Sequence, residues 1–164
     1  MRLFAGLGLS LALAGFVWAA PTFPRQPSVR AIEASIRRDG ARETVNALVD
    51  QNRWDYVSSR IASGKARWVA LASQLAPGTD AGTAEDLPIA LAYALPLNAR
   101  AVLAVAWTRT VDLTDVCGVP FIEGAAPNIP AYKRRALAAV ERVDDPGLAP
   151  FRAACLDALR TATQ

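Results

Sequence analysis

The segment NARAVLAVAW, residues 98–107, decides the fold class of this chain. It opens on Asn98, a residue that favours the N-cap position of a helix. From Ala101 to Trp107 it is apolar almost all round, which is typical of a helix at the centre of a packed domain. We therefore expect an all-α protein with this helix near its middle.

Apolar stripes at helical spacing flank this segment on both sides. They predict about eight helices of ordinary length, arranged as stacked α-hairpins. Most of the starts are marked by a side chain that accepts hydrogen bonds from free helix amides. The other expected starts include positions near Ser28, Asn52 or Arg53, Thr83, Asn128 and Asp145.

Residues 108–129 interrupt the helical pattern. Residues 110–114 alternate between polar and apolar side chains, which predicts a short extended piece. Glycines and prolines punctuate the rest, so we expect an ordered loop. Upstream, Thr83 and Asp86 predict a capping pair, which would place Pro88 in the first turns of a helix, where its missing amide costs little.

Two cysteines, Cys117 and Cys155, are the only thiols of the chain. An even count in an exported protein predicts one disulfide. A metal pair is an alternative, but the chain has no histidine to complete the ligand set. A redox pair is another, although such pairs more often have Cys-x-x-Cys spacing.

The first residues have the pattern of a secretory signal peptide. Arg2 is followed by an apolar run over residues 3–17, and small residues suited to cleavage end at Ala19. The run is shorter than the ~20 residues that a membrane span needs. We expect removal of residues 1–19.

The chain after this cleavage site divides into two parts. Three prolines over residues 20–27 favour an extended leader. Residues 28–164 form one α-helical domain, which we expect in the periplasm or outside the cell.

The composition of the chain argues against nucleic acid and membranes as binding partners. Apolar residues make up 52% of the chain and the formal net charge is +3. No run of Lys and Arg exceeds two residues, so we expect no nucleic-acid binding, which needs a concentrated basic stripe. No second long apolar segment follows residues 3–17, so we expect no membrane span.

The absence of histidine removes much of the usual catalytic chemistry. A Ser-His-Asp triad, a Cys-His pair and a His-based zinc site are all impossible here. The chain has no Gly-rich phosphate loop either. We therefore expect no metal and no cofactor.

Carboxylates leave one route to catalysis, because glycoside cleavage needs only acids. Glu123 follows the apolar residues 120–122, whose surroundings could raise the pKa of a carboxyl group. The simpler interpretation is that Glu123 pairs with an arginine or faces water. The other candidate acids are Asp80, Glu85, Asp86, Asp112 and Asp115.

Aromatic and arginine side chains are the candidates for binding. Tyr56 falls off the apolar stripe of its helix and lies near Arg53, while Trp107 closes the most apolar helix. Together with Glu123 these residues form the candidate binding set, since Tyr, Trp and Arg often anchor protein interfaces. The alternative for each aromatic ring is partial burial with its polar tip in water.

Two resemblances bear on the fold. Residues 65–69 (KARWV) and 98–102 (NARAV) match at an offset of 33 positions, which resembles an array of HEAT-like α-hairpins. Residues 52–56, 75–82, 94–103 and 117–123 make the chain resemble small exported proteobacterial helical proteins that have no assigned activity. This second resemblance implies a helical fold and an exported location, and it brings no catalytic residues.

These observations favour an exported, non-enzymatic module that binds another periplasmic protein. An immunity-type or adaptor-type protein is one version, by analogy of fold. A carboxylate-dependent cell-wall hydrolase with Glu123 as general acid is the rival hypothesis, and a carrier of a small ligand is a third. The oligomeric state stays open.

Overall fold

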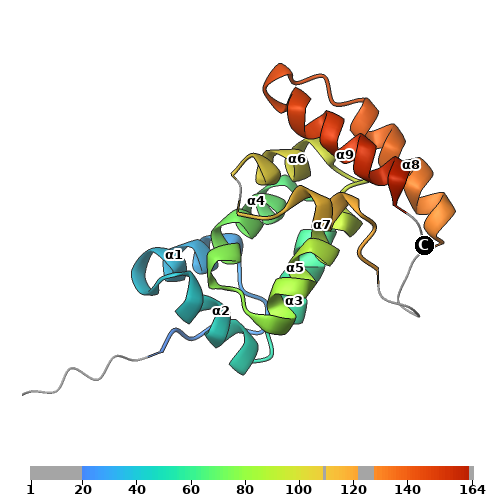
Figure 1. The fold of residues 1–164 in the computed structure, drawn as a ribbon. Coiled ribbons are helices and arrows are strands. Elements are labelled where there is room, and N and C mark those ends of the chain that lie inside the picture. The colour runs from blue at the N-terminus through green and yellow to red at the C-terminus, as the bar shows by residue number, and fades with distance from the viewer. Residues whose placement is uncertain (1–19, 109, 122–127, 163–164) are drawn as a thin grey trace, which may run out of the picture.

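The computed structural model describes residues 20–108, 110–121 and 128–162, apart from the side chain of Trp107. Every regular element in this part of the chain is a helix, so the all-α prediction is confirmed (Figure 1). No described helix has the length and apolar character needed to cross a membrane.

The first half of the domain holds five α-helices and one short 3-10 turn. They are α1 (Val29–Asp39), α2 (Ala41–Asp50), α3 (Trp54–Ala62), α4 (Ala66–Leu75), η1 (Ala76–Gly78) and α5 (Ala81–Ala94). The second half follows with α6 (Ala99–Trp107), α7 (Leu113–Cys117), α8 (Ile129–Glu141), η2 (Pro146–Leu148) and α9 (Ala149–Thr161).

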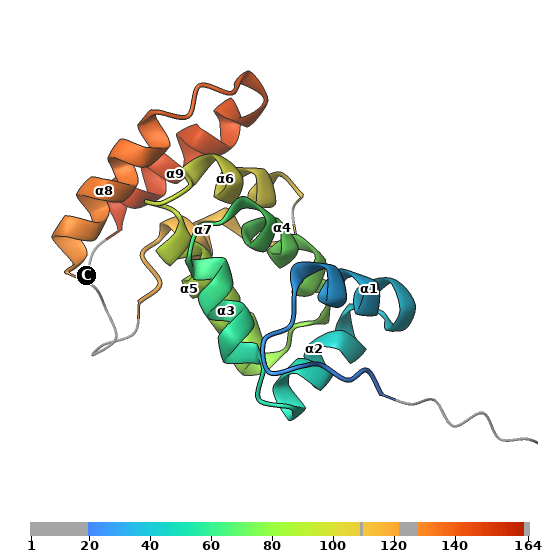
Figure 2. The ribbon, with the colours of Figure 1, turned by 180° about the vertical axis from the view of Figure 1, so that it is seen from behind.

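The helices form an elongated body, with α1 and α2 at one end and the paired α8 and α9 at the other (Figures 1 and 2). The closest packing often joins helices two apart along the chain: α3 with α5, α4 with α6, and α7 with α9. The HEAT-like stacking therefore stays a prediction, since the contacts do not establish a regular series of hairpins.

Helix α6 lies between the α8–α9 pair and the helices α4 and α5, in a central position that its apolar sequence predicts. It contacts α4 and α5 on one side and α8 and α9 on the other. Val102 and Leu103 are buried in the core. Asn98 caps the helix by accepting a hydrogen bond from the Ala101 amide (3.2 Å), and its side-chain amide donates to the Gly64 carbonyl (2.9 Å).

Three further predicted starts are confirmed by side-chain hydrogen bonds. Ser28 Oγ accepts from the amide of Ala31, which begins α1. Asn128 caps α8 in the same way, and Asp145 caps η2, from which α9 continues. Hydrogen-bond acceptors placed before an apolar stripe thus identify the starts of α1, α6, α8 and η2.

The predicted start of α5 at Thr83 is wrong. The cap is Asp80, and Thr83 is the third helical residue, whose hydroxyl accepts a hydrogen bond from the Asp80 amide (2.9 Å). Because α5 begins earlier than expected, Pro88 lies in its interior and not in its first turns. Asp80 and Thr83 can each cap a helix, so their positions in the sequence do not show which of them begins α5.

The extended piece predicted at 110–114 is also wrong. Asp112 accepts hydrogen bonds from the amide and the hydroxyl of Thr114, both at 2.8 Å, and begins the short helix α7. These two hydrogen bonds lower the pKa of the Asp112 carboxyl. The stretch 108–129 is therefore not irregular throughout.

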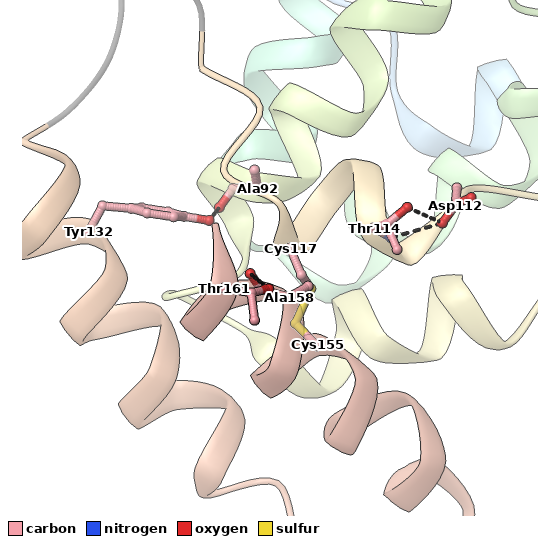
Figure 3. Close-up of a disulfide and its surroundings, with 8 residues drawn as sticks. All are labelled: Ala92, Asp112, Thr114, Cys117, Tyr132, Cys155, Ala158 and Thr161. Atoms are coloured by element: carbon pink, nitrogen blue, oxygen red, sulfur yellow. Dashed lines mark hydrogen bonds between the residues drawn. A yellow bond between two sulfur atoms is a disulfide. The ribbon is translucent and has the colours of Figure 1, made fainter. Parts of the chain in front are cut away.

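The disulfide between Cys117 and Cys155 is confirmed (Figure 3). It joins the last residue of α7 to the middle of α9, with 5.3 Å between the two Cα atoms. Both cysteines are fully buried. The bridge thus fixes a helix of one turn against the long C-terminal helix.

An aromatic cluster closes the core beside this bridge. The Phe121 ring lies 4.7 Å from that of Tyr93 and 4.8 Å from that of Tyr132, measured between centroids. Tyr132 is buried, and its hydroxyl donates a hydrogen bond to the Ala92 carbonyl at 3.0 Å (Figure 3). Burial raises the pKa of the Tyr132 phenol, so the group stays neutral.

We expect Tyr132→Phe to lower the free energy of unfolding by about 1 kcal/mol, because it removes a buried hydrogen bond to the Ala92 carbonyl, which then keeps only the Leu95 amide as a donor at 3.2 Å. Urea denaturation followed by circular dichroism measures the change. Tyr56→Phe is the control, since Tyr56 is only partly buried and we expect its change to be much smaller. Equal stability of the wild type and Tyr132→Phe would contradict the assigned role.

Candidate functional site

A shallow groove of about 630 Å³ lies where the starts of α1 and α4 approach the outer face of α3. Its walls combine two aromatic rings with four cationic side chains. We call it the cationic groove and define it by Arg30, Tyr56, Arg60, Lys65, Arg67 and Trp68.

Packing of α1 against α4, and of α3 against α4, brings these residues together. Arg30 lies in the first turn of α1, and Tyr56 and Arg60 stand one turn apart on α3. Lys65 is the residue before α4, and its side chain cannot accept a hydrogen bond. The start of α4 therefore opens into the groove without a side-chain cap.

The aromatic wall of the groove is ordered by ring contacts. The rings of Tyr56 and Trp68 meet edge to face, with 6.0 Å between centroids and 83° between planes. The guanidinium carbon of Arg60 lies 5.5 Å from the centroid of the Trp68 ring, within the range of a cation–π contact. The Nε atom of Arg60 is buried and has no hydrogen-bond partner among the described residues.

No carboxylate lines the cationic groove within the described chain. Nor does any of its four cations form an ion pair there, since the salt bridges seen in that part of the molecule join Arg38 to Asp39, Arg100 to Asp145 and Arg160 to Glu141. The partial positive charge at the starts of α1 and α4 adds to that of the side chains. The groove is therefore suited to an anionic group.

Of the predicted binding residues, the structure brings Tyr56 into the groove. Arg53 lies one turn earlier, where its Nε atom donates a hydrogen bond to the Pro24 carbonyl (3.1 Å) and so holds the leader. Trp107 ends α6, and its side chain is not among the described parts. Glu123 also lies outside the described residues, so its predicted role is not tested.

The sequence patterns did not indicate the four cations, and Trp68, which is buried in the core, also lines the groove. One signal was available in the segment 65–67, which places a lysine and an arginine at a helix start where acidic residues are usual. Another was the spacing of Tyr56 and Arg60, which puts both on one helix face. The contribution of Arg30 had no local signal, because packing of distant helices places it there.

Several acids that could have served a hydrolase have structural partners instead. Asp80 and Asp112 cap helices, and Asp86 accepts a hydrogen bond from the Trp54 indole at 2.9 Å. Glu85 and Asp115 share a separate open hollow between α5 and α7, but both are exposed to water. That hollow lacks the water-excluding surroundings that favour carboxylate acid–base chemistry.

The described residues also contain no group of three potential ligands that could hold a metal ion. No family model, curated protein or solved structure matches this chain. The resemblance to small exported proteobacterial proteins therefore stays a prediction.

Proposed function

We propose that this protein is an exported, non-enzymatic module that binds another periplasmic protein through the cationic groove. The observation that carries the proposal is the groove's lining, in which two contacting aromatic rings stand beside four cations without carboxylate partners. Tyr, Trp and Arg are the residues that most often anchor protein interfaces.

Two features of the fold support export. A buried disulfide such as Cys117–Cys155 is typical of proteins from oxidising compartments. The leader is also held firmly: Gln51 donates to the Pro21 carbonyl and accepts from the Phe23 amide, both at 2.8 Å. These hydrogen bonds begin just after the predicted cleavage site, so cleavage there would leave them intact.

The predicted cleavage would also create a charge at a suitable place. Ala20 and Pro21 line a hollow together with Asp39, Glu43 and Asp50. Cleavage after Ala19 would turn the neutral amide nitrogen of Ala20 into an ammonium group beside these acids. The mature terminus would then be electrostatically favourable in the fold.

We therefore expect a protein that begins at Ala20 to be more stable at neutral pH than its N-acetylated form, by about 0.5–1 kcal/mol, the range of a partly exposed ion pair. Thermal unfolding of the two forms measures the difference. The double variant Glu43→Gln and Asp50→Asn is the control, because it removes most of the expected difference. Equal stability of the two forms of the wild-type protein would contradict the prediction.

Photo-crosslinking in living cells tests the proposed function. A benzophenone amino acid replaces Ala66, which is exposed at the groove and leaves all four cations in place. The matched control replaces Ala154, which is exposed on α9 at the other end of the body.

We expect a discrete adduct with a protein in the periplasmic fraction from the Ala66 position only, and we expect excess unlabelled protein to suppress it. The suppression shows that the site is saturable. No adduct from either position, or the same adducts from both, would overturn the proposal.

A further inference from the structure

We infer that the cationic groove receives an acidic, extended segment of the partner protein, whose carboxylates bind at the starts of α4 and α1. This inference rests on the proposed function, because it specifies what occupies the same groove.

The first reason is the local balance of charge. The whole chain carries a formal net charge of only +3, yet four cations meet in this one groove without a described carboxylate among them. Like charges at short range repel each other, and an anionic occupant relieves that repulsion. A groove with this charge attracts acidic partners and disfavours basic ones.

The second reason is that two helices begin at the groove. Neither α1 nor α4 has an acidic residue in its first turn, although such residues normally complement the helix dipole there. Ser28 caps α1, whereas α4 has no side-chain cap at all. A partner carboxylate at α4 would accept hydrogen bonds from free backbone amides and pair with Lys65 or Arg67.

The aromatic wall favours a peptide over a small inorganic anion. Tyr56 is partly exposed and offers apolar surface that a phosphate ion would leave uncovered, whereas the carbon atoms of a peptide pack against such a ring. Trp68 is buried beneath it and supports the Tyr56 ring through their edge-to-face contact. The Arg60 Nε atom, which lacks an acceptor in the described chain, lies beside this wall. A segment with both carboxylates and carbon-rich side chains matches the whole lining.

A lipid surface fits less well than an acidic segment. Membrane-surface binding combines cations with large apolar side chains that enter the bilayer. Among the described residues, the exposed large hydrophobic side chains are Val49 and Leu97, and neither lines the groove. The cations therefore stand without the apolar anchors that a membrane surface requires.

Fluorescence anisotropy with a defined probe tests the inference. The probe is a labelled peptide of about ten residues that combines Asp and Glu with one Tyr, the length of a short extended docking segment. A control peptide of the same length has Asn in place of every Asp and Gln in place of every Glu. The protein is the disulfide-bonded chain that begins at Ala20.

Two double variants carry the same change of net charge. Lys65→Glu with Arg67→Glu reverses two exposed groove cations, and Arg134→Glu with Arg135→Glu reverses two exposed cations on α8. Circular dichroism and thermal unfolding check that both variants fold. Sodium phosphate and vesicles containing phosphatidylglycerol are added as separate competitors.

We expect the wild type to bind the acidic peptide and the groove variant to bind it at least about tenfold more weakly, while the α8 variant stays within about twofold of the wild type. Added salt should weaken binding, because three of the groove cations, Arg30, Lys65 and Arg67, are exposed. Equal binding of the amide peptide, equal loss in both variants, or no peptide binding would overturn the inference. Binding of the protein to the vesicles that persists when the acidic peptide is added would also overturn the inference.

The photo-crosslinking experiment and the peptide-binding experiment can fail independently of each other. A saturable Ala66 adduct without acidic-peptide binding would retain the interface and reject the acidic segment. The absence of any Ala66 adduct would reject the proposed interface itself, whatever the peptide does.

Discussion

Replacing Cys117 and Cys155 by serine should lower the free energy of unfolding by about 3–4 kcal/mol, the largest effect we expect from removing one bond. The bridge closes a loop with a sequence separation of 38, and breaking it increases the conformational freedom of the unfolded chain. Helix α7 spans only five residues, too few for a helix to persist without tertiary support.

Loss of the disulfide should therefore destabilise α7 before the other helices. We expect its backbone amides to exchange with solvent faster in the variant than those of α4, which lies farther from the bridge. Guanidinium denaturation measures the stability, and hydrogen exchange locates the change. The variant with alanine at both cysteine positions is the control, because it removes the disulfide without burying two serine hydroxyls. A loss below about 1 kcal/mol in both variants would contradict the structural role of the bridge.

Leu103→Ala should lower the free energy of unfolding by about 2–5 kcal/mol, because it opens a cavity in a tightly packed site. Leu103 has no exposed surface and lies on α6, which contacts α4 and α5 as well as the α8–α9 pair. Its loss weakens the element that joins the two groups of helices.

The chain offers a matched control for this change. Leu97 lies just before α6 but is 66% exposed, so Leu97→Ala should change stability by less than about 0.5 kcal/mol. Urea denaturation of both variants measures the difference. Similar small effects for the two leucines would contradict the central position of α6.

The sequence predicts the all-α class and the disulfide well, because both depend on local or countable features. Asn98 and the apolar residues after it identify α6 without any tertiary information. Cys117 and Cys155 leave one possible intrachain pairing. The start of α5 is harder, since Asp80 and Thr83 are equally good caps and only the fold decides which amides they meet.

The candidate site is predicted only in part for a physical reason. Tyr56 lies off its apolar stripe and so signals exposure, but the cations beside it come from different helices. Arg30 and Lys65 are far apart in the chain, and packing of α1 on α4 brings their ends together. The spacing of residues within one helix does not indicate which distant helix packs against it.

Nuclear magnetic resonance tests most directly whether the cationic groove is the binding surface. ¹⁵N-labelled protein that begins at Ala20 is titrated with the acidic peptide while backbone amides and indole N–H groups are followed. We predict the largest shifts at the Arg67 amide and the Trp68 indole, with little change on α8 and α9. Shifts that centre on α8 and α9, or that spread evenly over the exposed cations, would contradict this assignment.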